Sequence, residues 1–232
     1  MTEANFVSKT MWLAAKDLRI EMRARDTLAP MLGFAATVAL VLAFALPDSS
    51  AGQSVVAYVQ AGFMWVTILF AGLIGFGRTF EVERAEGALD SLLLVPVDRS
   101  ALFLSKALSN LAFVVVLELV LLPLTALLFA FDLGPSWAGL VAVVALVDVG
   151  FVAVGTLYAA LAAQTRSREL LLPLLALPAL VPVFIAALEL TADLLLGAGF
   201  EAVAARGWFG ILVAFDVIFV TAGALLFDPA LD

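Results

Sequence analysis

The chain has 232 residues, of which 64% are apolar and only 14% are charged. A soluble domain typically carries about 45–50% apolar and about 25% charged residues, so a soluble enzyme or binding module is excluded. The absence of Cys and His excludes disulfides, zinc thiolates, iron–sulfur clusters, imidazole metal sites and a Ser-His-Asp triad. The net charge of −8 argues against general affinity for nucleic acid. The composition predicts an all-α polytopic membrane protein with no catalytic, cofactor or metal site.

The first predicted element is an amphipathic helix within residues 1–27. Its apolar residues recur at spacings of three and four and share one face: Val7, Met11, Ala14, Leu18 and Met22. Trp12 suits the headgroup region, so we expect this helix to lie on membrane lipid at the inner leaflet. A solvated charged helix is the alternative. A cleaved signal peptide is disfavoured, because a long charged stretch precedes the first apolar run.

Six hydrophobic segments follow, each long enough to cross a bilayer core about 30 Å thick, which needs about 20 apolar residues. They are residues 28–47, 55–76, 107–131, 138–163, 170–188 and 208–227. With the N-terminus inside, eleven of the twelve Lys and Arg residues fall on the cytoplasmic side, and only Arg206 falls outside. Since basic residues favour the cytoplasmic side, the sequence predicts a multi-pass protein of the plasma or inner membrane with both termini cytoplasmic.

The longest polar stretch, residues 77–106, joins the second and third spans. Its first part has a helical pattern, and Pro96 ends that helix because proline disfavours helical geometry in the residue before it. We expect either a solvated connector or a docking surface for a cytoplasmic partner. On a docking surface, Gly87 would allow close backbone approach and Arg84 would pair with an acidic partner. The residues predicted to take part are Phe80, Glu81, Glu83, Arg84, Gly87, Asp90 and Leu92.

Three acidic residues lie inside predicted spans: Glu118, Asp148 and Asp216. An ionisable group near the bilayer centre costs about 2.5–3.5 kcal/mol, and such groups usually face a bundle interior or water. They form either a polar path or hydrogen bonds that join helices. No basic residue lies in the spans, so ion pairing there is not expected.

The outer segment 189–207 is too apolar for a free loop and too short to cross the membrane twice. A half-inserted, re-entrant hairpin fits this composition, and such a hairpin is a plausible outer gate.

A family resemblance rests on the stretch that follows the second span. Residues 78–106 carry the pattern R-x-F-x-x-E-R-x-x-G-A-L-x-x-L-L-L-x-P-V-x-R-S-x-x-x-x-x-K. Supporting stretches are KDLRIE at 16–21, LELVLLPL at 117–124 and the proline-studded segment 172–182. The chain resembles the permease subunits of ABC-2 type exporters, and within them the CcmB family of the cytochrome c maturation (haem exporter) system. The resemblance covers nearly the whole chain, including the six-span layout.

An ATP-driven machine needs a P-loop, in which a Lys follows a Gly. None of the three lysines here does so, so we expect ATP to bind a separate subunit. The resemblance implies a CcmA-like ATPase, a second copy of the permease, and CcmC-like and CcmD-like membrane partners.

The implied function is haem export or release of a haem-charged chaperone. Because the chain lacks His and Cys, we expect a mechanical role rather than haem ligation. An ABC-2 permease for a lipid, polysaccharide or drug is the alternative. An intramembrane enzyme is disfavoured, because clustered catalytic groups are absent.

Overall fold

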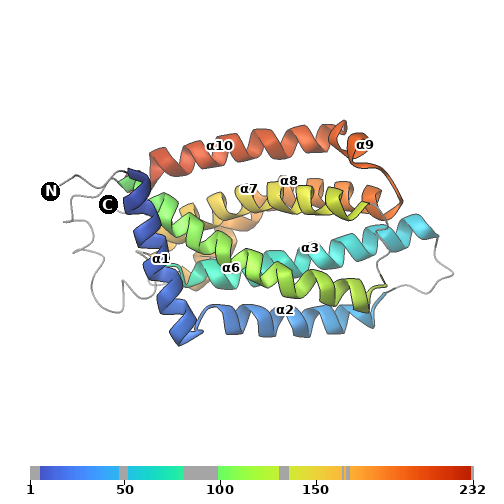
Figure 1. The fold of residues 1–232 in the computed structure, drawn as a ribbon, viewed down its shortest axis with the longest axis horizontal. Helices are drawn as coiled ribbons and strands as arrows, with labels where there is room; N and C mark the ends of the chain where they lie inside the picture. Colours follow the sequence, from blue (N-terminus) through green and yellow to red (C-terminus); the bar gives the residue numbers. More distant parts are fainter. Residues whose placement is uncertain are drawn as a thin grey trace.

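The computed structural model describes residues 6–46, 52–80, 99–130, 136–163, 165 and 168–230. Every regular element in these ranges is a helix, which confirms the all-α prediction. The helices are α1 (Phe6–Ala24), α2 (Leu28–Ala43), α3 (Gln53–Gly77), α6 (Arg99–Leu128), α7 (Trp137–Ala163), α8 (Arg168–Leu195), α9 (Phe200–Ala204) and α10 (Gly207–Ala230). The long helices run alongside one another, and α1 crosses one end of the bundle (Figure 1).

Within the described residues, five helices are long and apolar enough to cross a membrane, namely α3, α6, α7, α8 and α10. A sixth span results if α1 and α2, which meet at 67°, are counted as one bent span. Helix α2 has 16 residues and is therefore about 24 Å long, shorter than the bilayer core. It coincides with the predicted first span but ends at Ala43 rather than Pro47.

Helix α7 is the most buried span and packs against α8, α10, α6 and α3. Aromatic rings fit into glycine notches between α3 and α7: a Cβ on Gly155 would overlap the Phe76 ring, and a Cβ on Gly72 would overlap the Phe151 ring. These two rings lie 4.8 Å apart, centroid to centroid. The Phe151 ring also contacts Phe184 of α8, at 5.2 Å. Helices α3, α7 and α8 therefore form an interlocked core, since no side chain at the two glycines keeps the helices apart.

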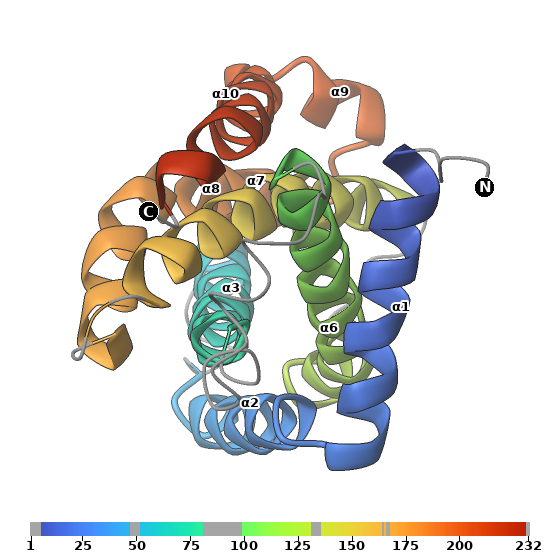
Figure 2. The same cartoon turned by 90° about the vertical axis from the view of Figure 1, so that its left-hand side faces the viewer.

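Helices α2 and α10 lie at opposite edges of this core (Figure 1), α2 against α3 and α6, and α10 against α7 and α8. Viewed from the end that α1 crosses, α1 lies along α6 and runs toward α2 (Figure 2). The Thr10 and Ala14 side chains of α1 face the bundle and are buried. Met11, Trp12 and Met22 are exposed. Ala14 thus lies on the bundle side rather than with the exposed apolar residues of the predicted stripe.

The first part of the predicted outer segment 189–207 belongs to helix α8, which ends at Leu195. Gly197, two residues later, has a positive φ of 87° and terminates the helix. The amide of Ala198 donates to the carbonyl of Asp193, 2.9 Å away, as in a glycine-terminated helix. The short helix α9 then leads into α10. Whether this segment enters the membrane stays a prediction.

Candidate functional site

The candidate site is the end of the bundle from which residues 81–98 leave and return. Glu81, Glu83, Arg84, Gly87, Asp90 and Leu92 of the predicted coupling surface lie outside the described residues. Phe80 is described, as the last residue before the segment. Helix α6 begins at Arg99, directly after it. The structure therefore describes the two residues at which the segment is attached, Phe80 and Arg99. The contacts near these two residues form the candidate site.

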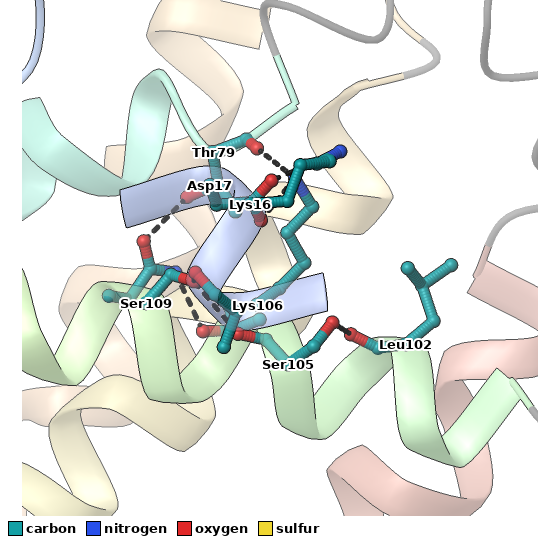
Figure 3. Close-up of polar contacts among 10 residues, drawn as sticks. Lys16, Asp17, Thr79, Leu102, Ser105, Lys106 and Ser109 are labelled. Carbon is teal, nitrogen blue, oxygen red and sulfur yellow. Dashed lines mark hydrogen bonds and ion pairs between the residues drawn. The ribbon is translucent and has the colours of Figure 1, made fainter. Parts of the chain in front are cut away.

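Lys106 of α6 is the centre of a polar network at this end (Figure 3). Its side chain is only 5% exposed, and its Nζ lies 3.0 Å from Asp17 Oδ2 of α1. The same Nζ donates to the backbone carbonyl of Thr79, at 3.2 Å, and lies 5.4 Å from the centre of the Phe80 ring. A buried ammonium is costly unless it is paired and hydrogen-bonded. Lys106 meets that requirement by joining α1, the end of α3 and the start of α6.

The network continues one turn along α6 at Asn110, which is buried. The Thr79 hydroxyl donates to Asn110 Oδ1, at 3.1 Å, and Asn110 Nδ2 donates to the Thr156 hydroxyl of α7, at 2.9 Å. Thr79 is thus bonded twice to α6, through its carbonyl and its hydroxyl. These bonds connect the entry of the 81–98 segment to the central helix of the bundle.

Phe80 packs in an aromatic cluster rather than lying on a docking surface. Its side chain is 4% exposed, and its ring lies 6.2 Å from that of Phe227 on α10. The Phe227 ring lies 5.3 Å from that of Phe103 on α6. Gly223 of α10 makes room for the Phe103 ring, which a Cβ there would overlap. Phe80 therefore anchors the segment to α6 and α10.

The bend between α1 and α2 is also held at this end. Glu21 is buried, and its Oε1 accepts hydrogen bonds from the amides of Thr27 and Leu28, both at 2.8 Å. A carboxylate at this position satisfies free amides and interacts favourably with the positive N-terminal end of α2. Arg78, directly after α3, donates to the Asp26 carbonyl, at 2.6 Å. The bend is therefore fixed to the end of α3.

The structure brings together two of the three predicted intramembrane acids. The Glu118 carboxyl of α6 lies close to the Asp148 carboxyl of α7, and both side chains are buried. Two ionised carboxylates repel, so a hydrogen bond between these two groups would require a proton on one of them. Asp216 of α10 lies elsewhere, against Gly150 of α7, where an added Cβ would lie 2.5 Å from its Oδ1. Gly150 and Asp148 are two residues apart on α7, which is more than half a helical turn. Asp216 therefore packs on a different side of α7 from Glu118.

The far end of the bundle has a smaller polar group. Tyr58 of α3 donates to Glu189 Oε2 of α8, at 3.0 Å, and Trp65 Nε1 donates to the Thr191 hydroxyl, at 2.9 Å. Arg206 pairs with Asp193 at 2.6 Å and is half exposed. The outer part of α8 is thus bonded to α3 and to the turn before α10.

Comparison with known proteins decides the family. The sequence pattern of the family described as CcmB protein matches residues 8–232. The chain belongs to the CcmB family. Among curated relatives, the heme exporter protein B of Rhodobacter capsulatus is 30% identical over 178 residues, covering 77% of this chain and 80% of that protein. The heme exporter protein B of Paracoccus denitrificans is 31% identical over 174 residues, covering 75% and 78%.

This CcmB-family chain is therefore a multi-pass membrane permease subunit of the cytochrome c maturation system, and its family implies an ABC exporter complex with an ATPase partner. The pairing of Asp17 with Lys106 is not among the features predicted from the sequence, although both residues belong to stretches that carry the family resemblance. A signal was present: Lys106 stands at the edge of a long apolar helix, where a buried cation needs an acidic partner.

Proposed function

We propose that this CcmB-family permease is the non-catalytic membrane subunit of an ATP-driven complex, and that a separate ATPase docks on residues 81–98. The observation that carries this proposal is the double anchoring of the segment. Thr79 hydrogen-bonds α6, and Phe80 packs against α10, so both residues attach the start of the segment to spanning helices. Lys106 of α6 adds a hydrogen bond to the Thr79 carbonyl. A partner that pushes on the segment would therefore act directly on spanning helices.

The proposed orientation places this end of the bundle in the cytoplasm. The basic residues of α1 lie at this end, as do Arg78 and Lys106, whereas Arg206 lies at the other end, between α9 and α10 (Figure 1). Such a bias favours the cytoplasmic side. Single cysteines at Ser91 and Ala198, in a chain that has no natural Cys, test it. An impermeant thiol reagent should label them from opposite sides, and labelling of position 91 from outside would reverse the orientation.

The partners and cargo follow from the family. We propose a complex of two permeases and two CcmA-like ATPases with CcmC-like and CcmD-like membrane proteins. Both relatives are named heme exporter protein B, which supports haem as cargo. Because this chain has no His and no Cys, its proposed part is mechanical: it moves helices in response to ATP hydrolysis, for haem export or release of a haem-charged chaperone.

The docking experiment uses Gly87→Trp and Arg84→Glu. The first adds bulk where the ATPase should approach closely, and the second reverses a charge that should face an acidic surface. Both variants should insert normally but lose co-purification of the ATPase and production of c-type cytochromes. Matched controls are Gly210→Trp, where an added side chain meets open space, and Glu201→Arg on the exposed helix α9. If both test variants keep the ATPase and normal cytochrome levels, the segment is only a connector.

A further inference from the structure

A buried ion pair joins α1 to the base of the 81–98 segment, beside a hydrogen bond from Ser109 of α6 to α1. We infer that Asp17 and Lys106 are positioning residues that make α1 move as one body with this segment. A displacement imposed on the segment by the ATPase would then reach α1 as well as the spanning helices. This inference rests on the proposed function, because it assumes that an ATPase acts on residues 81–98.

The geometry gives Lys106 the position of a junction. Its ammonium meets the Asp17 carboxylate on one side and two residues that follow α3, Thr79 and Phe80, on the other. One cation thus contacts α1 and the entry of the segment at once. Asp17 is 12% exposed, so water screens this pair much less than a surface pair. Movement of Thr79 relative to α6 would therefore disturb the contact that holds α1.

The bonds around this pair place α1 on the start of α6. Ser109, one turn from Lys106 and buried, donates to the Ala14 carbonyl of α1 at 3.4 Å (Figure 3). Lys16 lies 3.1 Å from Asp17 Oδ1, so each Asp17 oxygen faces an ammonium. The bundle-facing positions of α1 that form these bonds, Ala14 and Asp17, are three residues apart and share a face.

The sides of α1 that face away from the bundle carry exposed apolar residues beside exposed basic ones, Arg19 and Arg23. The exposed fractions are 57% for Met11, 70% for Trp12 and 75% for Met22. Helix α1 therefore presents one side to the base of the segment and another to its surroundings, in the manner of a helix that rests on a lipid surface. A rigid link through Asp17 would carry a movement of the segment to that exposed side.

The test separates transmission from docking. A single cysteine replaces Met22, which has no packing role, and carries an environment-sensitive fluorophore. The labelled permease is reconstituted in nanodiscs with its ATPase subunit, and fluorescence is followed on addition of ATP. We expect a nucleotide-dependent change in the otherwise unmodified chain. Asp17→Asn should reduce it about fivefold or more, the lower end of typical coupling between sites, while the ATPase still co-purifies. Glu201→Gln, a carboxylate neutralised at the far end, should keep the full change.

Lys106 provides the second pair of variants. Lys106→Arg keeps the charge and should retain the fluorescence change, whereas Lys106→Met should lose it. A general loss of folding would lower the yield of folded protein and ATPase binding together, so bound ATPase with no signal identifies transmission. A full signal in both Asp17→Asn and Lys106→Met, with the ATPase bound, would overturn the inference and leave the proposed function intact. If no ATPase binds even the unmodified permease, the proposed function itself fails.

Discussion

Replacing Lys106 with Met tests how strongly the polar network stabilises this end of the bundle. Met keeps most of the aliphatic volume but removes the ammonium. The Asp17 carboxylate then loses one of the two cations that it meets among the described residues, and the Thr79 carbonyl loses a donor. Removing one partner of a buried ion pair typically costs about 3–5 kcal/mol, because an uncompensated charge remains.

The expected cost here is smaller than that range, because Lys16 stays 3.1 Å from the other Asp17 oxygen. The lost contact with the Phe80 ring adds about 0.5–2 kcal/mol. We therefore expect Lys106→Met to lower the free energy of unfolding by about 2–3 kcal/mol. Lys9→Met, the same change at a position of α1 outside this network, should stay within about 0.5 kcal/mol of wild type.

The assay is equilibrium unfolding of the purified permease in mixed micelles of increasing SDS content, followed by tryptophan fluorescence. The double variant Lys106→Met with Asp17→Asn removes the stranded carboxylate. It should recover about 1–2 kcal/mol of the loss, since residues in contact show interaction energies of this size. A single variant as stable as wild type, or two costs that simply add, would refute the idea that Asp17 and Lys106 stabilise each other.

Three further predictions concern the core and the outer end. Gly155→Leu would force an aromatic ring of α3 out of its notch, so the yield of monodisperse protein in size-exclusion chromatography should fall sharply, while Gly210→Leu should not change it. Asp148→Asn keeps a polar group next to the buried Glu118 carboxyl, whereas Asp148→Leu should cost about 1–3 kcal/mol in the same SDS titration, partly recovered when Glu118 is also changed to Leu. Arg206→Gln breaks a half-exposed pair and should cost about 0–1 kcal/mol, decreasing further as salt rises; a larger cost would show that this pair holds the outer turn.

The sequence predicts the spans well because span length and hydropathy are local properties. Residues 138–163 nearly coincide with α7, and the last span with the apolar part of α10. The helices extend beyond the predicted apolar spans. Helix α6 starts at Arg99, before the span that begins at Ala107, and α8 continues past Leu188 to Leu195. Hydropathy marks where the apolar core begins, whereas a helix continues as long as its polar residues find partners.

The candidate site could be predicted only in part, because its contacts join distant positions. Asp17 and Lys106 belong to separate helices, and no periodicity relates them. Phe80 has the apolar character of a docking residue, and only the packing against Phe227 reveals that it is an anchor. Glu118 and Asp148 are each predicted to be costly inside a span, but their proximity to each other depends on how α6 and α7 align. Residue chemistry thus indicated which groups need partners, and the fold determined which partners they have.

The contrast between the core and α1 indicates how a push on residues 81–98 would spread. The Phe76 ring occupies the notch at Gly155, so α3 cannot slide along α7 without a clash. Helix α3 should therefore carry a displacement at Thr79 through the bundle together with α7. At this same end α1 is held to α6 by polar contacts, the Asp17–Lys106 pair and the Ser109–Ala14 bond among them, rather than by interlocking shapes. A movement of the segment should hence appear as a rigid shift of the core, with α1 following less closely when the Asp17–Lys106 pair is removed.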